Sequence, residues 1–382
     1  MLGRLLTVAC FGGAWLGSTT LGFAAAQYAI VDLGDLGGGY AQGRAINEQG
    51  QVAGYALLPA TGTVQRAFLW QAGALGDLGT LGGQQSSALG INSAGTVCGW
   101  AQAASGNGLP ALWSGSAVIA LPTLGGASGT AWGINDAGTA VGHSYLSAGG
   151  YHAALWSGGI IRDLGTLGGD YSIAYDINNR GVAVGTASDA SGRDRAVLWG
   201  QGGPIDLGGL SGGQWSTARG INDLGQVILQ GNPQGATENR AAFWNGDPLS
   251  PVIDLGTLEG GESWAWALND FGFVVGWEEV AVNAYYHAFV WDGVEKTDLG
   301  TLGGFYSSAY GINDQGIIVG FATDAFARTH AVEWVPVPEP AALLFGLLGG
   351  GMVGLWTRCR RQNQRSGCRI SRCGRAHHTL PL

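Results

Sequence analysis

The chain has 382 residues, of which 71 are Gly and 12% are charged, and its Gly residues follow no three-residue period, which excludes collagen. The 46% of hydrophobic residues and the 15 Trp exclude a disordered chain. Residues 27–335 carry ten basic residues against 26 acidic ones, a formal balance of 10 − 26 = −16, which argues against nucleic acid as a partner because an acidic body repels phosphate backbones.

Residues 1–26 have the features of a secretory signal peptide. Met1–Arg4 is short and basic, and Leu5–Leu21 is largely apolar. Ala24 and Ala26 then supply the small residues that signal peptidase accepts, so we predict cleavage after Ala26. The alternative is a buried N-terminal helix, which the lack of an amphipathic period disfavours.

A phrase of the form Ser-x-Ala-x-Gly-Ile-Asn-Asp-x-Gly recurs along residues 27–335. Its Asn falls at seven positions that are 43–47 residues apart: Asn47, Asn92, Asn135, Asn178, Asn222, Asn269 and Asn313. A fixed period of this size predicts a stacked or ring-closed array of supersecondary units.

Each repeat reads as four strands, of which the first ends at the recurring Asn. In Ser307–Asn313 small residues alternate with bulky ones, which is the period of a strand. We expect the small face to pack against the bulky face of the next unit. The Asn and Asp are predicted to build a tight turn, not to act as catalytic groups, and the second strand follows, as in Ile317–Gly320.

The third strand ends in a Trp in every unit and begins with His or Arg in six of them. The Trp is predicted to pack, and a slot filled by either His or Arg predicts a recurring hydrogen-bond or stacking position, not a ring of metal ligands. The fourth strand ends in Asp-Leu-Gly, except for Ala120-Leu121-Pro122 in one unit. Cys98 is the only Cys of this region, so we predict no disulfide, no metal and no cofactor there.

Four short strands in about 44 residues are typical of a propeller blade. The chain enters on a fourth strand, Tyr28–Leu33, and leaves after a third strand, His330–Trp334. We therefore predict an all-β, seven-bladed β-propeller over residues 27–335, in which Tyr28–Leu33 completes the sheet of Ser307–Trp334 and closes the ring. The alternative is an open solenoid, which would need capping repeats.

The recurring strings H/R-A-x-x-W and D-L-G-x-L-G-G-x-x-S-x-A-x-G-I-N-D-x-G resemble the HAF repeat of predicted extracellular bacterial proteins, over residues 28–334. The strand order is also similar to that of a WD-repeat blade, although the signature residues differ. The HAF resemblance implies a secreted or surface location and brings no known reaction with it.

Residues 336–361 are predicted to be a sorting segment. Val335–Pro340 is expected to be stiff, extended and unpaired with any sheet, because it holds three prolines. Ala341–Trp356 is apolar and is predicted to be a transmembrane helix, with the Arg cluster that follows held in the cytoplasm. A plain stop-transfer anchor is the alternative interpretation.

The same segment resembles the PEP-CTERM sorting signal, on the residues Val337, Pro338, Glu339 and Pro340, the apolar helix, and Arg358, Arg360 and Arg361. In that family an exosortase, an integral membrane cysteine transpeptidase, is believed to process the tail during export. The resemblance implies transient anchoring in the inner membrane and delivery to the surface or extracellular matrix of a Gram-negative-type bacterium. Residues 362–382 depart from the pattern and are expected to be a disordered basic tail.

Only one group of aromatic and acidic residues stands apart from the repeat. The candidate ligand-binding residues are Trp264, Trp266, Trp277, Glu262 and Glu279. Aromatic rings can stack on sugars and carboxylate pairs cleave glycosides. The alternative is that the Trp pack between units and that Glu278 and Glu279 are solvated loop residues.

No residue is predicted to be catalytic, because the hydrolase and phosphate-loop motifs are lacking. We predict a non-enzymatic binding or structural component, with an extracellular polysaccharide as its candidate partner. The alternative is a secreted propeller glycan hydrolase or lyase. The variable connections between second and third strands are expected to gather on one face, where binding usually occurs.

Overall fold

The computed structural model describes residues 27–59, 63–258, 261–280 and 285–337, and every element that it describes is a β-strand. The predicted signal peptide, most of the sorting segment with its apolar stretch, and the basic tail lie outside the described residues. Among the described residues, no helix long and apolar enough to cross a membrane is found.

The strands fall into four classes, one member of each per repeat. The first strands are β2 (Ala41–Ile46), β6 (Gly82–Ile91), β10 (Gly125–Ile134), β14 (Gly168–Ile177), β18 (Ser216–Ile221), β22 (Ser263–Leu268) and β26 (Gly303–Ile312). The second strands are β3 (Val52–Leu57), β7 (Val97–Ala103), β11 (Ala140–Leu146), β15 (Ala183–Asp189), β19 (Val227–Gly231), β23 (Val274–Val280) and β27 (Ile318–Asp324). The third strands are β4 (Gln65–Gln71), β8 (Gly108–Ser114), β12 (Tyr151–Ser157), β16 (Asp194–Gly200), β20 (Arg240–Trp244), β24 (Tyr285–Trp291) and β28 (Thr329–Val337). The fourth strands are β5 (Ala74–Asp77), β9 (Ala117–Ala120), β13 (Ile160–Asp163), β17 (Gly203–Gly208), β21 (Ile253–Asp254), β25 (Lys296–Asp298) and β1 (Gln27–Gly34).

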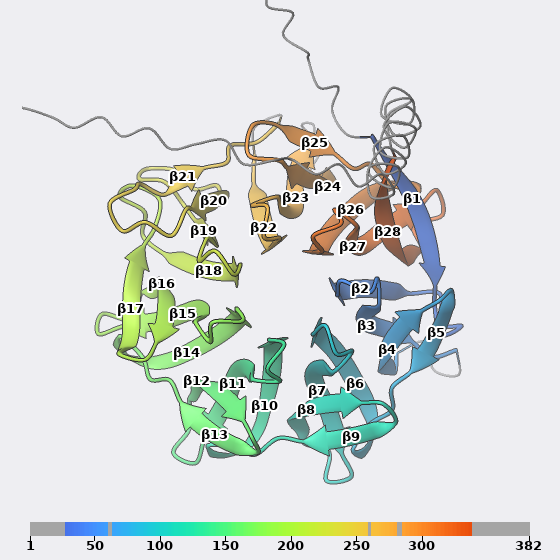
Figure 1. Cartoon of the computed structure of the whole chain (residues 1–382), viewed down its shortest axis with the longest axis horizontal. Coiled ribbons are helices and arrows are strands. Elements are labelled where there is room, and N and C mark those ends of the chain that lie inside the picture. Colours follow the sequence, from blue (N-terminus) through green and yellow to red (C-terminus); the bar gives the residue numbers. More distant parts are fainter. Residues whose placement is uncertain (1–26, 60–62, 259–260, 281–284, 338–382) are drawn as a thin grey trace, which may run out of the picture.

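Within each unit the four strands pair in order and antiparallel. In two places, two neighbouring units join into one sheet of eight strands. Each junction is a single parallel residue pair between the third strand of one unit and the first strand of the next, Tyr151 with Tyr171 and Tyr286 with Tyr306. Figure 1 shows the units arranged around a centre, with the first strands nearest to it. This arrangement of four-stranded sheets around a central channel is that of a β-propeller.

The N-terminal strand β1 pairs with β28 of the last unit, from Gln27 with Val337 to Gly34 with Ala331. The predicted pairing of this strand is therefore confirmed. The expectation that the segment from Val335 onward stands outside the sheet is wrong as far as Val337, because Pro336 pairs with Tyr28. Pairing of β28 with β27 ends at Trp334, so Pro336 has a neighbour on one side only, where a residue without an N–H is tolerated.

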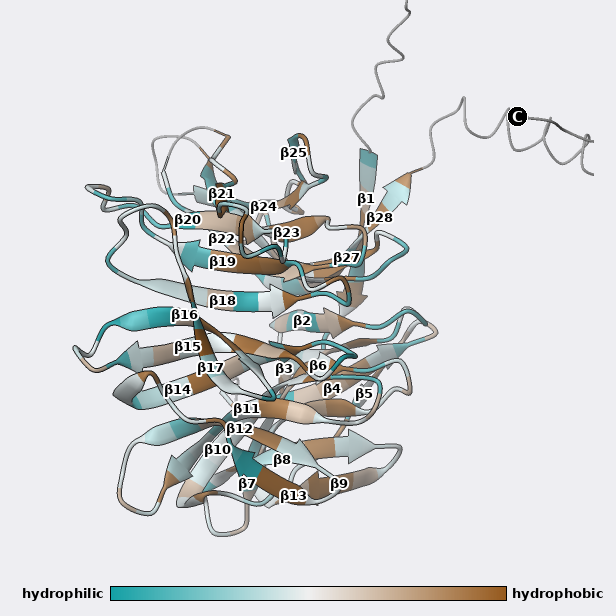
Figure 2. Cartoon of the chain, turned by 60° about the vertical axis from the view of Figure 1, so that its left-hand side comes forward, coloured by the Kyte–Doolittle hydropathy of each residue, from teal (hydrophilic) through white to brown (hydrophobic). Residues whose placement is uncertain are grey.

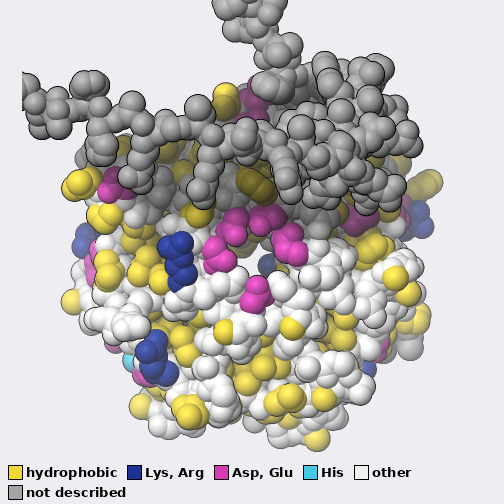
Figure 3. Space-filling view, in the orientation of Figure 1, with side chains coloured by type: hydrophobic (Ala, Val, Ile, Leu, Met, Phe, Trp, Pro, Cys, Tyr) yellow, Lys and Arg dark blue, Asp and Glu magenta, His cyan; other side chains and the backbone are white. Residues whose placement is uncertain are grey.

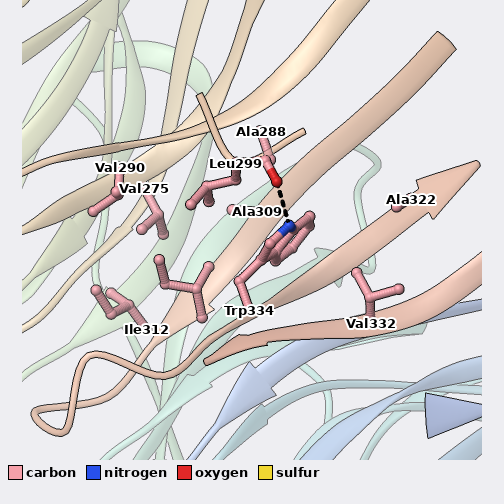
Figure 4. Close-up of a cluster of buried hydrophobic side chains, with 10 residues drawn as sticks. Val275, Ala288, Val290, Leu299, Ala309, Ile312, Ala322, Val332 and Trp334 are labelled. Atoms are coloured by element: carbon pink, nitrogen blue, oxygen red, sulfur yellow. Dashed lines mark hydrogen bonds between the residues drawn. The ribbon is translucent and has the colours of Figure 1, made fainter. Parts of the chain in front are cut away.

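Apolar residues from neighbouring units form the cores between the sheets. In Figure 4, Trp334 lies among Val275, Leu299 and Ala309, which come from two successive units. Its indole Nε1 donates to the carbonyl of Leu299 at 2.9 Å, and its side chain is fully buried. Figure 2 shows hydrophobic residues along the second strands, for example β19 and β23. The predicted packing role of the third-strand Trp is thus confirmed.

In five units the His or Arg that begins the third strand pairs with the Asp that ends the fourth strand, whereas Arg240 donates to Thr257 Oγ1 at 3.3 Å. Five such pairs lie at 2.8–3.1 Å: Arg66–Asp77, His152–Asp163, Arg195–Asp206, His287–Asp298 and His330–Asp32. The unit with the aberrant fourth strand lacks both partners, because it has Leu109 and Ala120 at the two positions. The prediction of a recurring hydrogen-bond position is confirmed.

The recurring Ser of the first strand joins one unit to the preceding one. Ser172 Oγ donates to the carbonyl of Gly165 at 2.7 Å and accepts the N–H of Ala153, in the third strand of the preceding unit, at 2.8 Å. The same pair of bonds recurs at Ser86, Ser216, Ser263 and Ser307. The hydroxyl therefore satisfies two buried backbone groups at each of these junctions.

The interpretation of Glu278 and Glu279 as solvated loop residues is wrong, because both lie on a strand, where Glu278 is buried and Glu279 is half-buried. The second strand β23 continues to Val280, and Glu278 lies on it, facing inward. Its carboxylate pairs with Lys296 Nζ at 2.8 Å, and the two side chains are 1% and 5% exposed. The sequence offered no signal for this pair, because the only Lys of the region lies 18 residues away.

Candidate functional site

The recurring Asn side chains form a closed ring of hydrogen bonds around the channel. In six of the seven units the Asn Oδ1 accepts two N–H groups of its own turn, as Asn178 does from Arg180 and Val182, and Asn135 accepts the N–H of Thr139. Each Nδ2 donates at 3.0–3.2 Å to the backbone carbonyl of the next Asn, and Asn313 donates to Asn47. The turn role was predicted, whereas the bond between units was not, although one Asn per unit at a fixed place could have suggested it.

The residue after each Asn forms a second ring, called here the carboxylate ring: Glu48, Ser93, Asp136, Asn179, Asp223, Asp270 and Asp314. Six of the seven backbone N–H groups in this ring donate at 2.7–2.9 Å to the side chain of the next member. Loss of hydration on burial, with neighbouring carboxylates, raises the pKa of Glu48 and Asp270.

The carboxylate ring surrounds a cavity of about 380 Å³ at one end of the channel. Figure 3 shows acidic side chains gathered around this central opening, with a basic side chain visible inside it. No group of three or more His, Cys, Asp or Glu in the described part of the chain is placed to hold a metal ion. The side chains of the carboxylate ring accept hydrogen bonds from backbone N–H groups of neighbouring units. We therefore assign this ring to the scaffold.

Deeper in the channel, the seven residues three positions before each Asn differ from unit to unit. This aromatic–arginine layer consists of Arg44, Leu89, Trp132, Tyr175, Arg219, Trp266 and Tyr310. It lines a second cavity, of about 180 Å³, together with the Ile and Leu that precede the Asn. The expectation that bulky residues pack against the small face of the next sheet is therefore wrong for this layer, whose residues border the channel. The Ile or Leu before the Asn, for example Ile312 and Leu268, also belongs to a core between sheets.

Both arginines of the layer lie over aromatic rings. The guanidinium carbon of Arg219 is 4.1 Å from the ring centre of Tyr175 and 5.0 Å from that of Trp266. The guanidinium carbon of Arg44 is 3.8 Å from the ring centre of Tyr310. These are cation–π distances. Burial lowers the pKa of Arg219, yet a guanidinium stays protonated in proteins. The layer therefore carries two positive charges.

Asp176 is the only carboxylate among the residues that line this second cavity. Its two oxygens accept the backbone N–H groups of Ile177, at 2.8 Å, and of Ile221, at 2.9 Å. Burial raises the pKa of Asp176 to about 6, so its charge is costly in the folded protein. Other units have Gly or Ala at this position, for example Gly133 and Ala267.

The three predicted Trp stack together, but only Trp266 lines the cavity. Ring centres are 5.9 Å apart for Trp264 and Trp266, and 6.1 Å apart for Trp264 and Trp277. Glu262 and Glu279 lie beside them and line neither axial cavity. Glu262 accepts from Asn239 Nδ2 at 2.8 Å, and Glu279 accepts from the N–H of Glu262 at 3.3 Å.

A second aromatic cluster adjoins the layer at Trp132. The indole Nε1 of Trp132 donates to His143 Nδ1 at 3.2 Å, and the imidazole contacts the rings of Tyr145 and Tyr151. Burial lowers the pKa of His143 to about 4, so the ring is neutral and can accept this bond at neutral pH. Sequence analysis missed His143 and both arginines, because nothing in the repeat indicates which positions face the channel.

No protein-family model matches the chain, and no curated protein matches it. Among solved structures, a puromycin-hydrolysing peptidase of Mycobacterium tuberculosis is similar with a TM-score of 0.53 and 11% identity, over 81% of this chain and 54% of that one. TolB from Acinetobacter baumannii has a TM-score of 0.43 and 12% identity, over 76% of this chain and 64% of that one. Aleuria aurantia lectin, described as a six-bladed β-propeller, has a TM-score of 0.37 and 12% identity, over 69% and 96%. At these identities the likeness concerns the fold alone.

Proposed function

We propose that the chain is an exported, seven-bladed propeller that binds a ligand in its axial channel and catalyses no reaction. Support for a closed ring comes from the pairing of β1 with β28 and from the bond of Asn313 to Asn47. With its first and last units joined, such a ring leaves no end unit in need of a cap.

The binding role is inferred from where the residues that vary between units lie. The polar residues that repeat in each unit form hydrogen bonds within the scaffold. They are the Ser of the first strand, the Asn, the residue after the Asn, and the His or Arg with its Asp. The positions that vary between units instead line the aromatic–arginine layer. Because the strands are antiparallel, the connections between second and third strands lie at the end of the channel away from the Asn turns, nearer this layer. Variable residues on a rigid scaffold are the usual place of binding.

The placement of Glu262 and Glu279 gives the glycan hydrolase alternative no support. Both carboxylates accept bonds from groups beside them, and neither lines an axial cavity. A hydrolase would need two carboxylates facing each other across a bound sugar.

The proposal of export, processing by signal peptidase and exosortase, and location at the cell surface or extracellular matrix rests on residues 1–26 and 336–361. Mass spectrometry of the mature protein after cell fractionation tests it. We expect an N-terminus at Gln27, loss of the tail beyond the Val337–Pro340 motif, and recovery outside the cytoplasmic membrane. A cytoplasmic protein that keeps Met1–Ala26 and Leu382 would overturn it.

A further inference from the structure

Three enclosed donors without acceptors lie side by side at the aromatic–arginine layer. They are Arg219 Nε, Trp264 Nε1 and Trp266 Nε1, none of which has a hydrogen-bond partner. The guanidinium carbon of Arg219 lies 5.9 Å and 5.0 Å from the centres of the two indoles. Buried donors in native proteins are almost always paired. A cluster in which every unpaired group is a donor indicates that the acceptor comes from outside the chain.

The charges of the layer point the same way. Five of the ten basic residues in 27–335 form ion pairs with carboxylates: Arg66, Arg193, Arg195, Lys296 and Arg328. Arg44 and Arg219 have no such partner among the described residues, although the same region holds 26 acidic residues. Asp176 lines the same cavity, but both of its oxygens accept backbone N–H groups. No carboxylate of the described residues therefore forms an ion pair with either of these two cavity-lining guanidinium groups.

The size and lining of the cavity restrict what that anion can be. At about 180 Å³ the cavity is smaller than the roughly 300–1,000 Å³ of sites for drug-sized ligands. One sugar ring or one chain end is an occupant of suitable size. The rings of Trp132, Tyr175, Trp266 and Tyr310 offer apolar faces. A planar guanidinium fork matches the two oxygens of a carboxylate.

We propose that the aromatic–arginine layer binds a uronate residue of an acidic polysaccharide, with its carboxylate on Arg219 and Arg44 and its ring against the aromatic side chains. This inference rests on the proposed binding function and names the class of ligand. The unpaired indole donor of Trp266, which lines the cavity, supplies a further bond to the acidic sugar.

Titration of the purified full-length protein tests the inference, with heat of binding and Trp emission as the two readouts. The probes are a trimer of galacturonate, the neutral trimer of galactose, and sodium sulfate. We expect the galacturonate trimer to bind and to change the Trp emission, and Arg219→Gln or Arg44→Gln to weaken binding ~10–100-fold, as loss of a charge-assisted bond does. Arg162→Gln removes the same charge from the exposed strand β13 and should leave the affinity unchanged.

Folding of each variant is checked by its thermal midpoint, and Arg219→Lys keeps the charge without the planar fork, so it should weaken binding less than Arg219→Gln. The inference is overturned if the neutral trimer binds as well as the acidic one, or if folded Arg219 and Arg44 variants bind like the wild type. Equal affinity for sulfate would overturn the sugar part of it. None of these outcomes touches the proposal of export, which the mature termini test separately.

Discussion

Replacement of Asn178 tests the hydrogen-bond ring that joins the units. The side chain is 5% exposed. Its Oδ1 accepts the N–H groups of Arg180 and Val182 at 3.1 and 3.0 Å, and its Nδ2 donates to the carbonyl of Asn222 at 3.1 Å. Asn178→Ala removes all three bonds, each worth about 1 kcal/mol net. We therefore expect the free energy of unfolding to fall by about 3 kcal/mol.

Asn178→Asp separates the turn from the bond between units. The aspartate keeps both turn acceptors, but it places a carboxylate oxygen opposite the carbonyl oxygen of Asn222, where Asn178 Nδ2 now donates. Its pKa in the folded protein should then be raised, because the ionised form is repelled. The variant should be destabilised at neutral pH and should regain stability as the pH falls through that raised pKa, since a protonated carboxyl can donate again.

Equilibrium unfolding in urea, followed by Trp fluorescence, measures these changes. Arg180→Ala is the matched control, because this exposed side chain lies in the same turn and its removal should cost less than about 0.5 kcal/mol. If the free energy of unfolding of Asn178→Ala lies within about 0.5 kcal/mol of that of the control, the ring does not hold the units together. An Asn178→Asp variant whose deficit is the same at acid and neutral pH would refute the role of Nδ2.

Three further predictions concern buried groups. Lys296→Met leaves the carboxylate of Glu278 buried and unpaired, so we expect a loss of about 3–5 kcal/mol in urea unfolding, partly recovered in the double variant with Glu278→Leu; a wild-type midpoint for the single variant would contradict this. Burial raises the pKa of Asp176 to about 6, so its ionised form costs the native state about 2–3 kcal/mol at neutral pH. Lowering the pH through this value should therefore stabilise the wild type relative to Asp176→Asn. Free energies of unfolding that change in parallel with pH for the two proteins would contradict this. Gly320→Ala would place Cβ 1.9 Å from a backbone oxygen of the neighbouring strand and should destabilise by at least about 1–3 kcal/mol, whereas Gly202→Ala, in open space, should not; equal thermal midpoints for the two variants would count against it.

The sequence alone determined the strand and turn pattern of each unit. Alternation of small and bulky residues, the Asn that accepts its own turn's N–H groups and the Trp that ends each third strand are local signals, readable within a few residues. The chain enters the repeat region on a fourth strand at Tyr28 and leaves it after a third strand at Trp334. This predicted the pairing of β1 with β28, because each kind of strand then occurs once per unit.

Only the tertiary structure shows which hydrogen bonds and ion pairs join residues that lie far apart in the sequence. The acceptor of each Asn Nδ2 lies 43–47 residues along the chain, or 266 for the bond that joins the two ends. Similarly, the sequence suggests a loop at Glu278, whereas in the structure strand β23 places its carboxylate beside Lys296 Nζ.

The candidate site was likewise predicted only in part. The Trp-rich stretch was identified, but Arg44 and Arg219 stand 175 positions apart and meet the same cavity only because their strands line one channel. Periodicity tells which face of a strand a residue occupies, whereas the curvature of the ring decides whether that face meets a neighbouring sheet or the central space. Strand and turn chemistry is local, and the channel with its unpaired donors exists only when all of the units are assembled.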